Sequence, residues 1–411
     1  MNLYLFNDND SAAIYGIGAY LKELMNVLDN TDIHVHIVHL HSDRPEFEIV
    51  NTDKIEHWYI PEVKNNNTFS GPVLKVEGYL RNVTYLLRLH INDTNDLVFH
   101  FNFNLCLLIA KELKESFNCK TVATVHFMKW ALELHGNLAR LQTIKTKPKS
   151  QRSSFEQLLY KTDDYEGLFY KQVDRLIALS KYTQAIICNE YQLNPDKVCV
   201  IPNGLADISC LSVDERFALR RKWGYTENEL LILFAGRLQA VKGLTFLIRA
   251  FRKVLAILPN CRLIVAGNGD FSMHLNECED IWTNVTWTGL IGKDKLYELY
   301  SIADIGVMPS FHEQCSYVAI EMMMHGLPII GSTSTGLKEM ISDGETGWHI
   351  PVVEYDDSVE IDTSLLAEKM MCLLQNPAER KRMGTNARKR YECFYSAAIF
   401  RKNMLEFYES L

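Results

Sequence analysis

Long apolar runs, cysteine motifs and an export signal are all missing from this chain of 411 residues. No stretch approaches about 18 consecutive apolar residues, so we predict no membrane-spanning helix. The N-terminus, MNLYLFNDND, lacks the basic segment and apolar core of a signal peptide and is typical of a first strand. The ten cysteines contain no Cys-x-x-Cys and no Cys/His cluster at zinc spacing, which indicates reduced thiols in a cytoplasmic protein.

An excess of positive charge is also missing. Lysine and arginine number 43 against 51 aspartates and glutamates, and the net charge of -8 argues against a nucleic-acid partner. The chain has no low-complexity tract and no repeat of short period. Its content of 47% hydrophobic and 23% charged residues is typical of a soluble globular protein, and its length predicts two domains.

Short apolar runs alternate with amphipathic stretches along the chain, which predicts α/β domains with parallel, doubly wound sheets of Rossmann-like type. The expected strands are Leu3–Phe6, His34–Leu40, Leu97–Phe103, Thr121–Phe127, Leu176–Ser180, Glu229–Ala235, Cys261–Ala266, Val285–Trp287, Ile305–Met308 and Pro328–Gly331. A polar link at Ala206–Asp214 interrupts the alternation, so we assign 1–205 to an N-terminal domain and 206–396 to a C-terminal domain. Sheets of this kind bind ligands at the carboxyl ends of their strands.

The stretch Pro309–Gly326 places two carboxylates beside a helix start. Glu313 lies on the turn after an expected strand, and Glu321 lies in a helix expected over 316–325. Unpaired backbone N–H groups at a helix start suit a phosphate, whereas carboxylates suit hydroxyl groups, so together they predict a nucleotide sugar as the ligand. The expected backbone donors are Gln314, Cys315, Ser316, Tyr317 and Val318. As an alternative, the two glutamates are solvated surface residues.

The spacing Glu-x7-Glu, followed by a small and apolar run to Ser332, resembles the donor-site signature of the retaining GT-B glycosyltransferases of family 4. The resemblance implies a GT-B fold, with two Rossmann-like domains facing a cleft and a last helix, 397–411, that packs back on the first domain. It also implies that Glu313 orients the sugar and that Glu321 binds the ribose hydroxyls. The family's Gly-Phe-Gly after the first glutamate is replaced here by Gln-Cys-Ser, which leaves the donor sugar open.

A glycine turn with two cations follows the first expected strand of the second half. Gly236 allows a sharp turn, and Arg237 and Lys242 then lie at the carboxyl end of the strand. There the Arg side chain can bind a diphosphate by paired hydrogen bonds and the Lys side chain as a point charge. The segment GRLQAVKG is similar to the diphosphate clamp of the family. Two exposed cations on a loop are the alternative.

Four more residues enter through the resemblance. It implies that Gly267 and Gly269 form a second glycine turn, where Gly269 lets the base or ribose approach the backbone closely. It also implies that the backbone of Leu290 and Ile291 reads the edge of the nucleobase.

The first half contributes a glycine turn and a histidine. Tyr15–Gly18, with Gly16 and Gly18, is similar to the family's N-terminal glycine loop, which approaches the donor phosphate and the acceptor. A dinucleotide fingerprint is the alternative, but Leu21 stands where that fingerprint requires its third glycine. His126 ends an expected strand, and the resemblance implies that it approaches the transferred sugar. A structural hydrogen bond is the other interpretation of this histidine.

No metal and no cofactor is expected. Asp8-Asn9-Asp10 spells the acidic metal motif of the other glycosyltransferase fold, GT-A, but here it ends the first strand instead of lying well inside the chain. Arg237 and Lys242 can offset the charge of a leaving diphosphate without a divalent cation.

A basic segment follows the strand of His126. Between positions 129 and 161, seven basic residues stand against two acidic ones. The segment is either a solvated insertion or a surface that attracts an anionic acceptor. The expected partners are therefore a nucleotide sugar and an acceptor glycan, glycolipid or peptide, with peripheral contact at the inner membrane face left open.

These features predict a metal-independent hexosyltransferase that moves a sugar from a nucleoside-diphosphate sugar to an acceptor hydroxyl, with retention of configuration, in the synthesis of cell-surface glycans. A nucleotide-sugar epimerase or a sugar phosphorylase on a similar frame is one alternative. The phosphorylase requires a cofactor lysine and a much longer chain. An inactive or accessory partner subunit is the other alternative, although Arg237, Lys242, Glu313 and Glu321 are all present.

Overall fold

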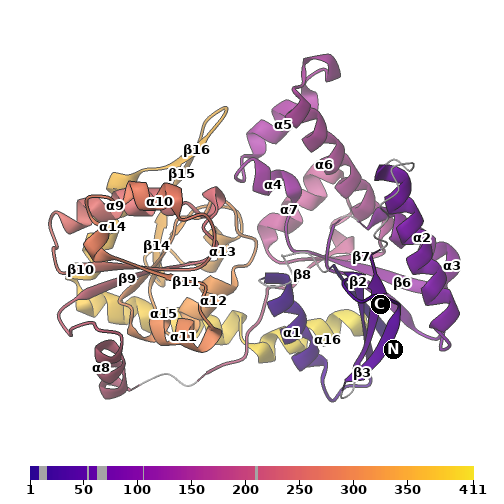
Figure 1. Ribbon diagram of the computed structural model, residues 1–411, viewed down its shortest axis with the longest axis horizontal. Coiled ribbons are helices and arrows are strands. Elements are labelled where there is room, and N and C mark those ends of the chain that lie inside the picture. Colours follow the sequence, from indigo (N-terminus) through magenta and orange to yellow (C-terminus); the bar gives the residue numbers. More distant parts are fainter. Residues whose placement is uncertain (9–15, 53–54, 63–71, 105, 209–211) are drawn as a thin grey trace. The chain divides into compact units, whose positions relative to one another are not determined.

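The computed structural model describes residues 1–8, 16–52, 55–62, 72–104, 106–208 and 212–411 (Figure 1). The chain forms two compact units. Unit 1 comprises Met1–Trp130, Ile144–Ile201 and Arg401–Leu411, and unit 2 comprises Ala131–Thr143 and Pro202–Phe400. The sequence had placed the whole of 1–205 in one domain, whereas Ala131–Thr143 is grouped with unit 2.

Unit 1 is built on an eight-stranded sheet with the strand order β3-β4-β2-β1-β5-β6-β7-β8. The strands are β1 (Asn2–Asp8), β2 (His34–Ser42), β3 (Glu48–Thr52), β4 (Ile55–Pro61), β5 (Leu97–Phe101), β6 (Cys119–Val125), β7 (Arg175–Ala178) and β8 (Val198–Val200). β3 pairs antiparallel with β4, and the other neighbours are parallel. Its central strands are apolar runs buried on both faces, as a parallel sheet covered by helices requires.

Helices cover both faces of this sheet. The helices with residues in unit 1 are α1 (Gly16–Leu28), α2 (Pro72–His90), α3 (Leu107–Ser116), α4 (Lys129–Glu133), α5 (Leu138–Thr146), α6 (Ser154–Gln172), α7 (Lys181–Tyr191) and α16 (Ala397–Glu409). Figure 1 shows α1 and α16 on one side of the sheet, and α2, α3 and α6 on the other. The end of α16 is tied to β5, because the hydroxyl of Tyr408 lies 2.7 Å from Nδ1 of His100.

Unit 2 is built on a six-stranded, wholly parallel sheet with the order β11-β10-β9-β12-β13-β14. Its strands are β9 (Leu230–Ala235), β10 (Cys261–Ala266), β11 (Val285–Gly289), β12 (Ile305–Met308), β13 (Ile329–Ser332) and β14 (Gly347–Ile350). A hairpin of β15 (Val352–Glu354) and β16 (Val359–Ile361) stands apart from that sheet. The segment Ala131–Thr143 reaches this hairpin, since Asn137 Nδ2 donates to the carbonyl of Tyr355 over 2.9 Å.

The helices of unit 2 are α8 (Val213–Lys222), α9 (Leu244–Leu255), α10 (Ser272–Glu277), α11 (Lys293–Ile302), α12 (Tyr317–Met324), α13 (Leu337–Met340), α14 (Thr363–Gln375) and α15 (Pro377–Phe394). In Figure 1, α9, α10 and α14 lie on one face of the sheet, and α11, α12 and α15 lie on the other. α9 shows why: Leu244, Leu247, Ile248 and Phe251 are spaced to form one apolar stripe, and all four are buried. Two units with parallel, doubly wound sheets confirm the predicted fold class.

Candidate functional site

Lys242 and Glu313 form an ion pair at the carboxyl edge of the unit 2 sheet. Lys242 ends a short 3₁₀ helix after β9, Glu313 lies on the loop after β12, and β9 and β12 are neighbours in the sheet. Lys242 Nζ lies 2.5 Å from Glu313 Oε1, and the two side chains are only 18% and 11% exposed. The structure thus brings together the cation and the carboxylate that the sequence singled out, at the edge where sheets of this kind bind ligands.

The loop that carries Glu313 is held by the turn after β13. The backbone N–H of Glu313 donates to Thr335 Oγ1 over 2.9 Å, and the N–H of Gly336 donates to the Glu313 carbonyl over 2.8 Å. A Cβ on Gly336 would lie 1.8 Å from the carbonyl oxygen of Gln314, so only glycine fits there. Sequence reasoning missed this support, whose only signal is the small-residue run STSTG before the helix.

His312, next to Glu313, is a further residue that sequence reasoning missed. It is only 4% exposed, and neither ring nitrogen has a hydrogen-bond partner in the described parts of the chain. Burial lowers the pKa of His312 to about 4, so the ring is neutral at neutral pH. Buried polar atoms are usually hydrogen-bonded, and a bound ligand is one way to satisfy this ring.

Glu321 is enclosed by side chains of α11. The hydroxyl of Tyr300 donates to Glu321 Oε2 over 2.9 Å, and Lys293 Nζ lies 3.7 Å from Oε1. The residue is 7% exposed, and burial raises the pKa of its carboxyl group. Glu321, which was expected to bind the ribose, is thus buried beside tyrosine hydroxyls before any nucleotide binds, which the sequence did not indicate.

The two glycine turns after β9 and β10 pack against each other. Gly236 and Gly267 have φ values of 147° and 154°, and a Cβ on Gly267 would lie 1.8 Å from the Gly236 carbonyl oxygen. A Cβ on Gly269 would lie 2.7 Å from Cβ of Leu238. The close approach that requires Gly269 in this structure is to Leu238, and the expected approach of base or ribose to the backbone here stays a prediction.

The start of α12 is partly as expected. No side chain caps this helix, but the N–H of Ser316 donates to Met340 Sδ over 3.2 Å, so it is not the unpaired donor that the sequence predicted. Asn203 Nδ2 donates to the carbonyl of Cys315 over 2.7 Å. Of the other residues expected to bind the donor substrate, Gln314 is buried before α12, and Tyr317 and Val318 begin that helix. Arg237, which is partly exposed, follows β9, and Leu290 and Ile291 follow β11.

His126 belongs to unit 1, directly after β6. Its Nε2 lies 3.1 Å from Asn102 Oδ1, and its ring meets that of Tyr20 edge-on, with centroids 4.6 Å apart. Burial lowers the pKa of His126 to about 3, so the imidazole is neutral. Gly16 and Gly18 lie in the first turn of α1 and not in a loop before it, and Tyr15 lies outside the described residues.

The acidic motif at the end of β1 lies mostly outside the description: Asp8 is the last residue of β1, and Asn9 and Asp10 are not described. Over the described ranges, no group of three or more His, Cys, Asp or Glu side chains is placed to hold a metal ion. None of the helices in those ranges is both long and apolar enough to span a bilayer.

Two lysines of the basic segment form ion pairs within unit 1. Lys145 Nζ lies 3.2 Å from Asp163 and 3.4 Å from Glu190, and Lys147 Nζ lies 2.9 Å from Glu156. Asp163 and Glu190 lie outside the counted stretch and reduce its excess of positive charge, whereas Glu156 was already one of the two acidic residues counted.

Comparison with known proteins assigns both halves of the chain. Residues 14–207 match the family Glycosyltransferase Family 4, and residues 215–390 match Glycosyl transferases group 1. An uncharacterized glycosyltransferase of Methanocaldococcus jannaschii is 37% identical over 185 residues, which are 43% of this chain and 47% of that protein. The chain thus spans about half the length of the curated relatives it matches.

Two solved structures share the fold over the whole chain. Sucrose-phosphate synthase from Thermosynechococcus elongatus superposes with a TM-score of 0.76 at 20% identity, over 100% of this chain and 98% of that one. HepE from Anabaena, in complex with UDP, superposes with a TM-score of 0.70 at 16% identity, over 100% of both chains. These likenesses establish a GT-B fold, and with the two family matches they show that the chain belongs to the group 1, family 4 glycosyltransferases.

Proposed function

We propose that the protein transfers a sugar from a nucleoside-diphosphate sugar to an acceptor hydroxyl, with retention of the anomeric configuration. The observation that carries the proposal is the ion pair of Lys242 and Glu313, two scarcely exposed side chains at neighbouring strand ends. A cation and a carboxylate side by side match a ligand that presents phosphate and hydroxyl groups together.

Each member of the pair has a role in this reaction. When the donor binds, Lys242 exchanges the carboxylate for the diphosphate and, with Arg237, stabilises the charge that develops as the bond from the sugar to the diphosphate breaks. Glu313 accepts hydrogen bonds from the sugar hydroxyls, and the bonds from Thr335 and Gly336 keep its backbone in place during the exchange. Glu321 binds the ribose hydroxyls.

Retention follows if the acceptor attacks the face that the diphosphate leaves. A diphosphate oxygen then takes the proton of the acceptor hydroxyl, and no side chain has to act as a general base. His126 has a pKa of about 3 and is neutral, so its role is a hydrogen bond to the sugar and not the supply of charge.

We further propose that no metal ion or cofactor takes part, because Lys242, Arg237 and the start of α12 offset the leaving diphosphate. Activity is then expected to survive exhaustive chelation. Loss of activity with a chelator, and recovery with magnesium or manganese, would instead make Asp8-Asn9-Asp10 a metal site. Uridine nucleotides are the first donors to test, since the Anabaena protein of the same fold was solved with UDP.

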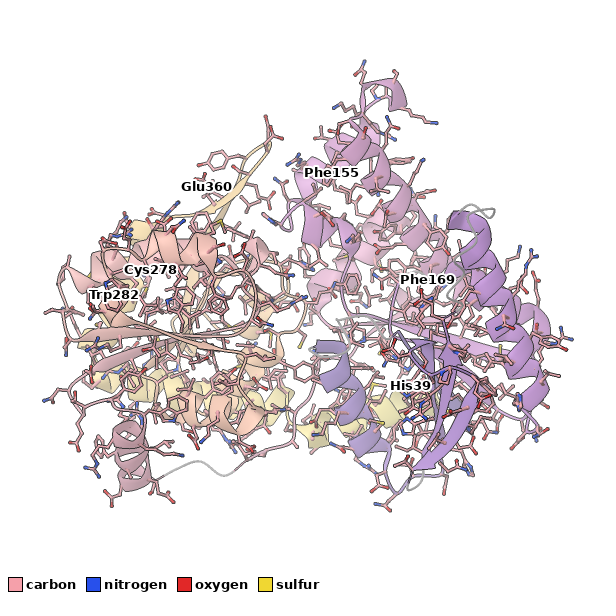
Figure 2. All side chains as sticks on the ribbon, in the orientation of Figure 1. His39, Phe155, Phe169, Cys278, Trp282 and Glu360 are labelled. Atoms are coloured by element: carbon pink, nitrogen blue, oxygen red, sulfur yellow. The ribbon has the colours of Figure 1, made fainter. Side chains whose placement is uncertain are left out.

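For the acceptor we propose a glycan, glycolipid or peptide of the cell surface, reached by a cytoplasmic enzyme in peripheral contact with the inner membrane face. Support comes from exposed apolar side chains on the layer formed by α2, α3 and α6 (Figure 2 labels Phe155). Phe155 and Leu158 on α6 are 43% and 66% exposed, and Tyr85 and Leu89 on α2 are 61% and 56% exposed. Apolar side chains among cations suit the headgroup region of an anionic bilayer.

The deciding experiment is a panel of nucleotide sugars tested for slow donor hydrolysis by the purified protein. We expect one donor to be hydrolysed, and Glu313→Gln to lower the rate of that hydrolysis, while the exposed Lys402→Gln in unit 1 serves as a control with full rate. Turnover of no donor would favour an inactive or accessory subunit. Change of the sugar without hydrolysis or transfer would favour an epimerase.

A further inference from the structure

A cavity of about 370 Å³ lies at the opposite edge of the unit 2 sheet from the ion pair of Lys242 and Glu313. Asp304, which lines it, directly precedes β12, and Leu327 and Pro328 directly precede β13. The cavity is therefore at the amino ends of the strands, between α8, α11, the end of α12 and the start of α15. The proposed reaction gives none of the lining residues a direct role, although Tyr300 in the lining holds Glu321.

Three cationic side chains line the cavity: Arg216 from α8, and Arg380 and Lys381 from α15. The one carboxylate in the lining is that of Asp304, and both of its oxygens are already bonded. Arg216 Nη2 lies 3.1 Å from Oδ1, and Nη2 of Arg220, behind the lining, lies 2.5 Å from Oδ2. Asp304 is shared between two arginines, so the cavity keeps an excess of positive charge.

Arg380 shows the effect of this excess. Its Nη1 donates to the carbonyl of Leu373 over 2.8 Å, at the end of α14, and no carboxylate pairs with it in the part of the chain that the structure describes. Burial lowers the pKa of Arg380, and the like charges of Arg216 and Arg220 lower it further, against the opposing effect of Asp304. A bound anion would relieve this repulsion.

His325 adds a second, independent demand for a ligand. Its Nδ1 lies 2.7 Å from the Glu321 carbonyl, so the proton is on Nδ1 and Nε2 carries a lone pair. Nε2 has no partner among the described residues and almost no accessible surface, so a ligand in the cavity that His325 lines reaches it only after a shift of the ring. Burial lowers the pKa of His325, which keeps Nε2 an acceptor at neutral pH. The atom that satisfies it must be an O–H or N–H donor.

We propose that this cavity binds a small phosphate monoester that also carries hydroxyl groups, with its phosphate on Arg216, Arg380 and Lys381 and a hydroxyl on His325 Nε2. Three cations around one carboxylate suit a dianion better than a single carboxylate ligand. The end of α12 and the start of α15 both line the cavity, so their opposed dipoles offset each other and the side chains decide the preference.

Such a ligand would also adjoin the donor site, a consequence that rests on the proposed function. The His325 ring lies 5.3 Å from the Tyr300 ring, and the Tyr300 hydroxyl holds Glu321. A ligand on His325 would therefore change the KM for the donor through Tyr300 and Glu321, while binding to the cavity itself does not depend on catalysis.

The test is calorimetry with glycerol 3-phosphate, in the presence of saturating UDP so that any nucleotide site is filled. We expect the wild type to bind it more tightly than orthophosphate and not to bind glycerol. Lys381→Glu, an exposed position in the lining, is expected to weaken binding at least about tenfold. Lys389→Glu is the matched control, because Lys389 is exposed on the same helix but does not line the cavity.

Four results would overturn the proposal. The first is that the wild type binds no phosphate monoester. The second is that saturating UDP or the substitution Lys242→Ala abolishes the binding. The third is that Lys389→Glu weakens the binding as much as Lys381→Glu does. The first outcome would mean that the cavity is not a binding site, the second that the phosphate binds in the donor site, and the third that the attraction is unspecific. Equal affinity for orthophosphate and glycerol 3-phosphate would remove the role of His325. Each readout is independent of turnover, so an inactive protein would still test the cavity.

Discussion

Lys242 Nζ and Glu313 Oε1 are 2.5 Å apart, although the two residues are 71 positions apart in the sequence. The turn after β9 carries one and the loop after β12 carries the other, so the pairing of these two strands creates the contact. Because both side chains are largely buried, each neutralises the charge of the other until a ligand binds, with its phosphate on Lys242 and its hydroxyl groups on Glu313.

A double-mutant cycle tests this pair. Lys242→Met is expected to lower turnover by about 10²–10³, as loss of one preorganised group does. It is also expected to lower the free energy of unfolding by about 2 kcal/mol, because Glu313 is left unpaired. Glu313→Gln in the same background is expected to restore stability but not turnover, measured by urea unfolding and initial rates. Additive stability effects would show that the pair does not form in solution.

Substitutions of Glu313 and of Glu321 are expected to impair different steps. Glu313→Gln lowers the rate, because its ligand is the sugar, and does not weaken the binding of free nucleoside diphosphate, because Lys242 no longer has to leave a carboxylate. Glu321→Ala weakens the binding of the free nucleotide, and Tyr300→Phe weakens it in the same direction but less, because the carboxylate remains and loses only one hydrogen bond. Calorimetry with the nucleotide alone decides, and the reverse order would mean that the two roles are exchanged.

Pattern alone predicted parallel sheets and the strands β1, β2, β5, β6, β7 and β9 to β13, but it did not indicate β3, β4, β8, β14 or the hairpin of β15 and β16. It placed Lys242 and Glu313 in one site because βα turns of neighbouring strands meet at one edge. It could not predict what each side chain touches there. Glu321 is enclosed by Tyr300 from another helix, and Gly269 makes room for Leu238, since both contacts depend on packing between distant segments.

The charge of the basic segment is a second property that the sequence alone could not predict. Seven cations between positions 129 and 161 suggested a surface charge, but Lys145 pairs with Asp163, which is buried, and Lys147 pairs with Glu156. Both partners lie on α6. Asp163 stands outside positions 129–161, so a count over those positions could not subtract it, whereas Glu156 was already counted.

Stability is expected to depend on pH through Glu166 in unit 1. This carboxyl group is 1% exposed, accepts a bond from Asn104 Nδ2 over 3.1 Å, and has its pKa raised to about 7 by burial. Between the ordinary pKa near 4.5 and about 7, the folded state holds a proton that the unfolded state has lost. The free energy of unfolding therefore falls as pH rises through this window, by up to about 3 kcal/mol.

Glu166→Gln removes this titration and is expected to flatten the stability profile between those pH values. The measurement is urea unfolding from pH 4 to 8 for both proteins, and an exposed control, Glu115→Gln on α3, keeps the slope of the wild type. A wild-type profile that rises over the same interval would show that Glu166 is ionised in the fold.

Membrane contact is best tested with residues that the fold leaves exposed. Lys145 and Lys147 are unsuitable, because replacing them breaks ion pairs within unit 1. Leu158 and Lys161 lie one turn apart on α6 and are both exposed. One apolar side chain and one cation each contribute about 1 kcal/mol or more at an anionic surface, so Leu158→Ser with Lys161→Ser is expected to weaken vesicle binding more than tenfold.

The measurement is co-sedimentation with anionic and with neutral vesicles at low and at high salt. The wild type is expected to bind anionic vesicles at low salt and to be released by salt, because the attraction is screened. Phe394→Ser with Lys389→Ser on α15 is the matched control, since it removes one exposed apolar side chain and one exposed cation from unit 2. Two results would contradict membrane contact through this part of α6: the wild type does not bind anionic vesicles at low salt, or the control substitutions weaken binding equally. A soluble acceptor would then be the better hypothesis.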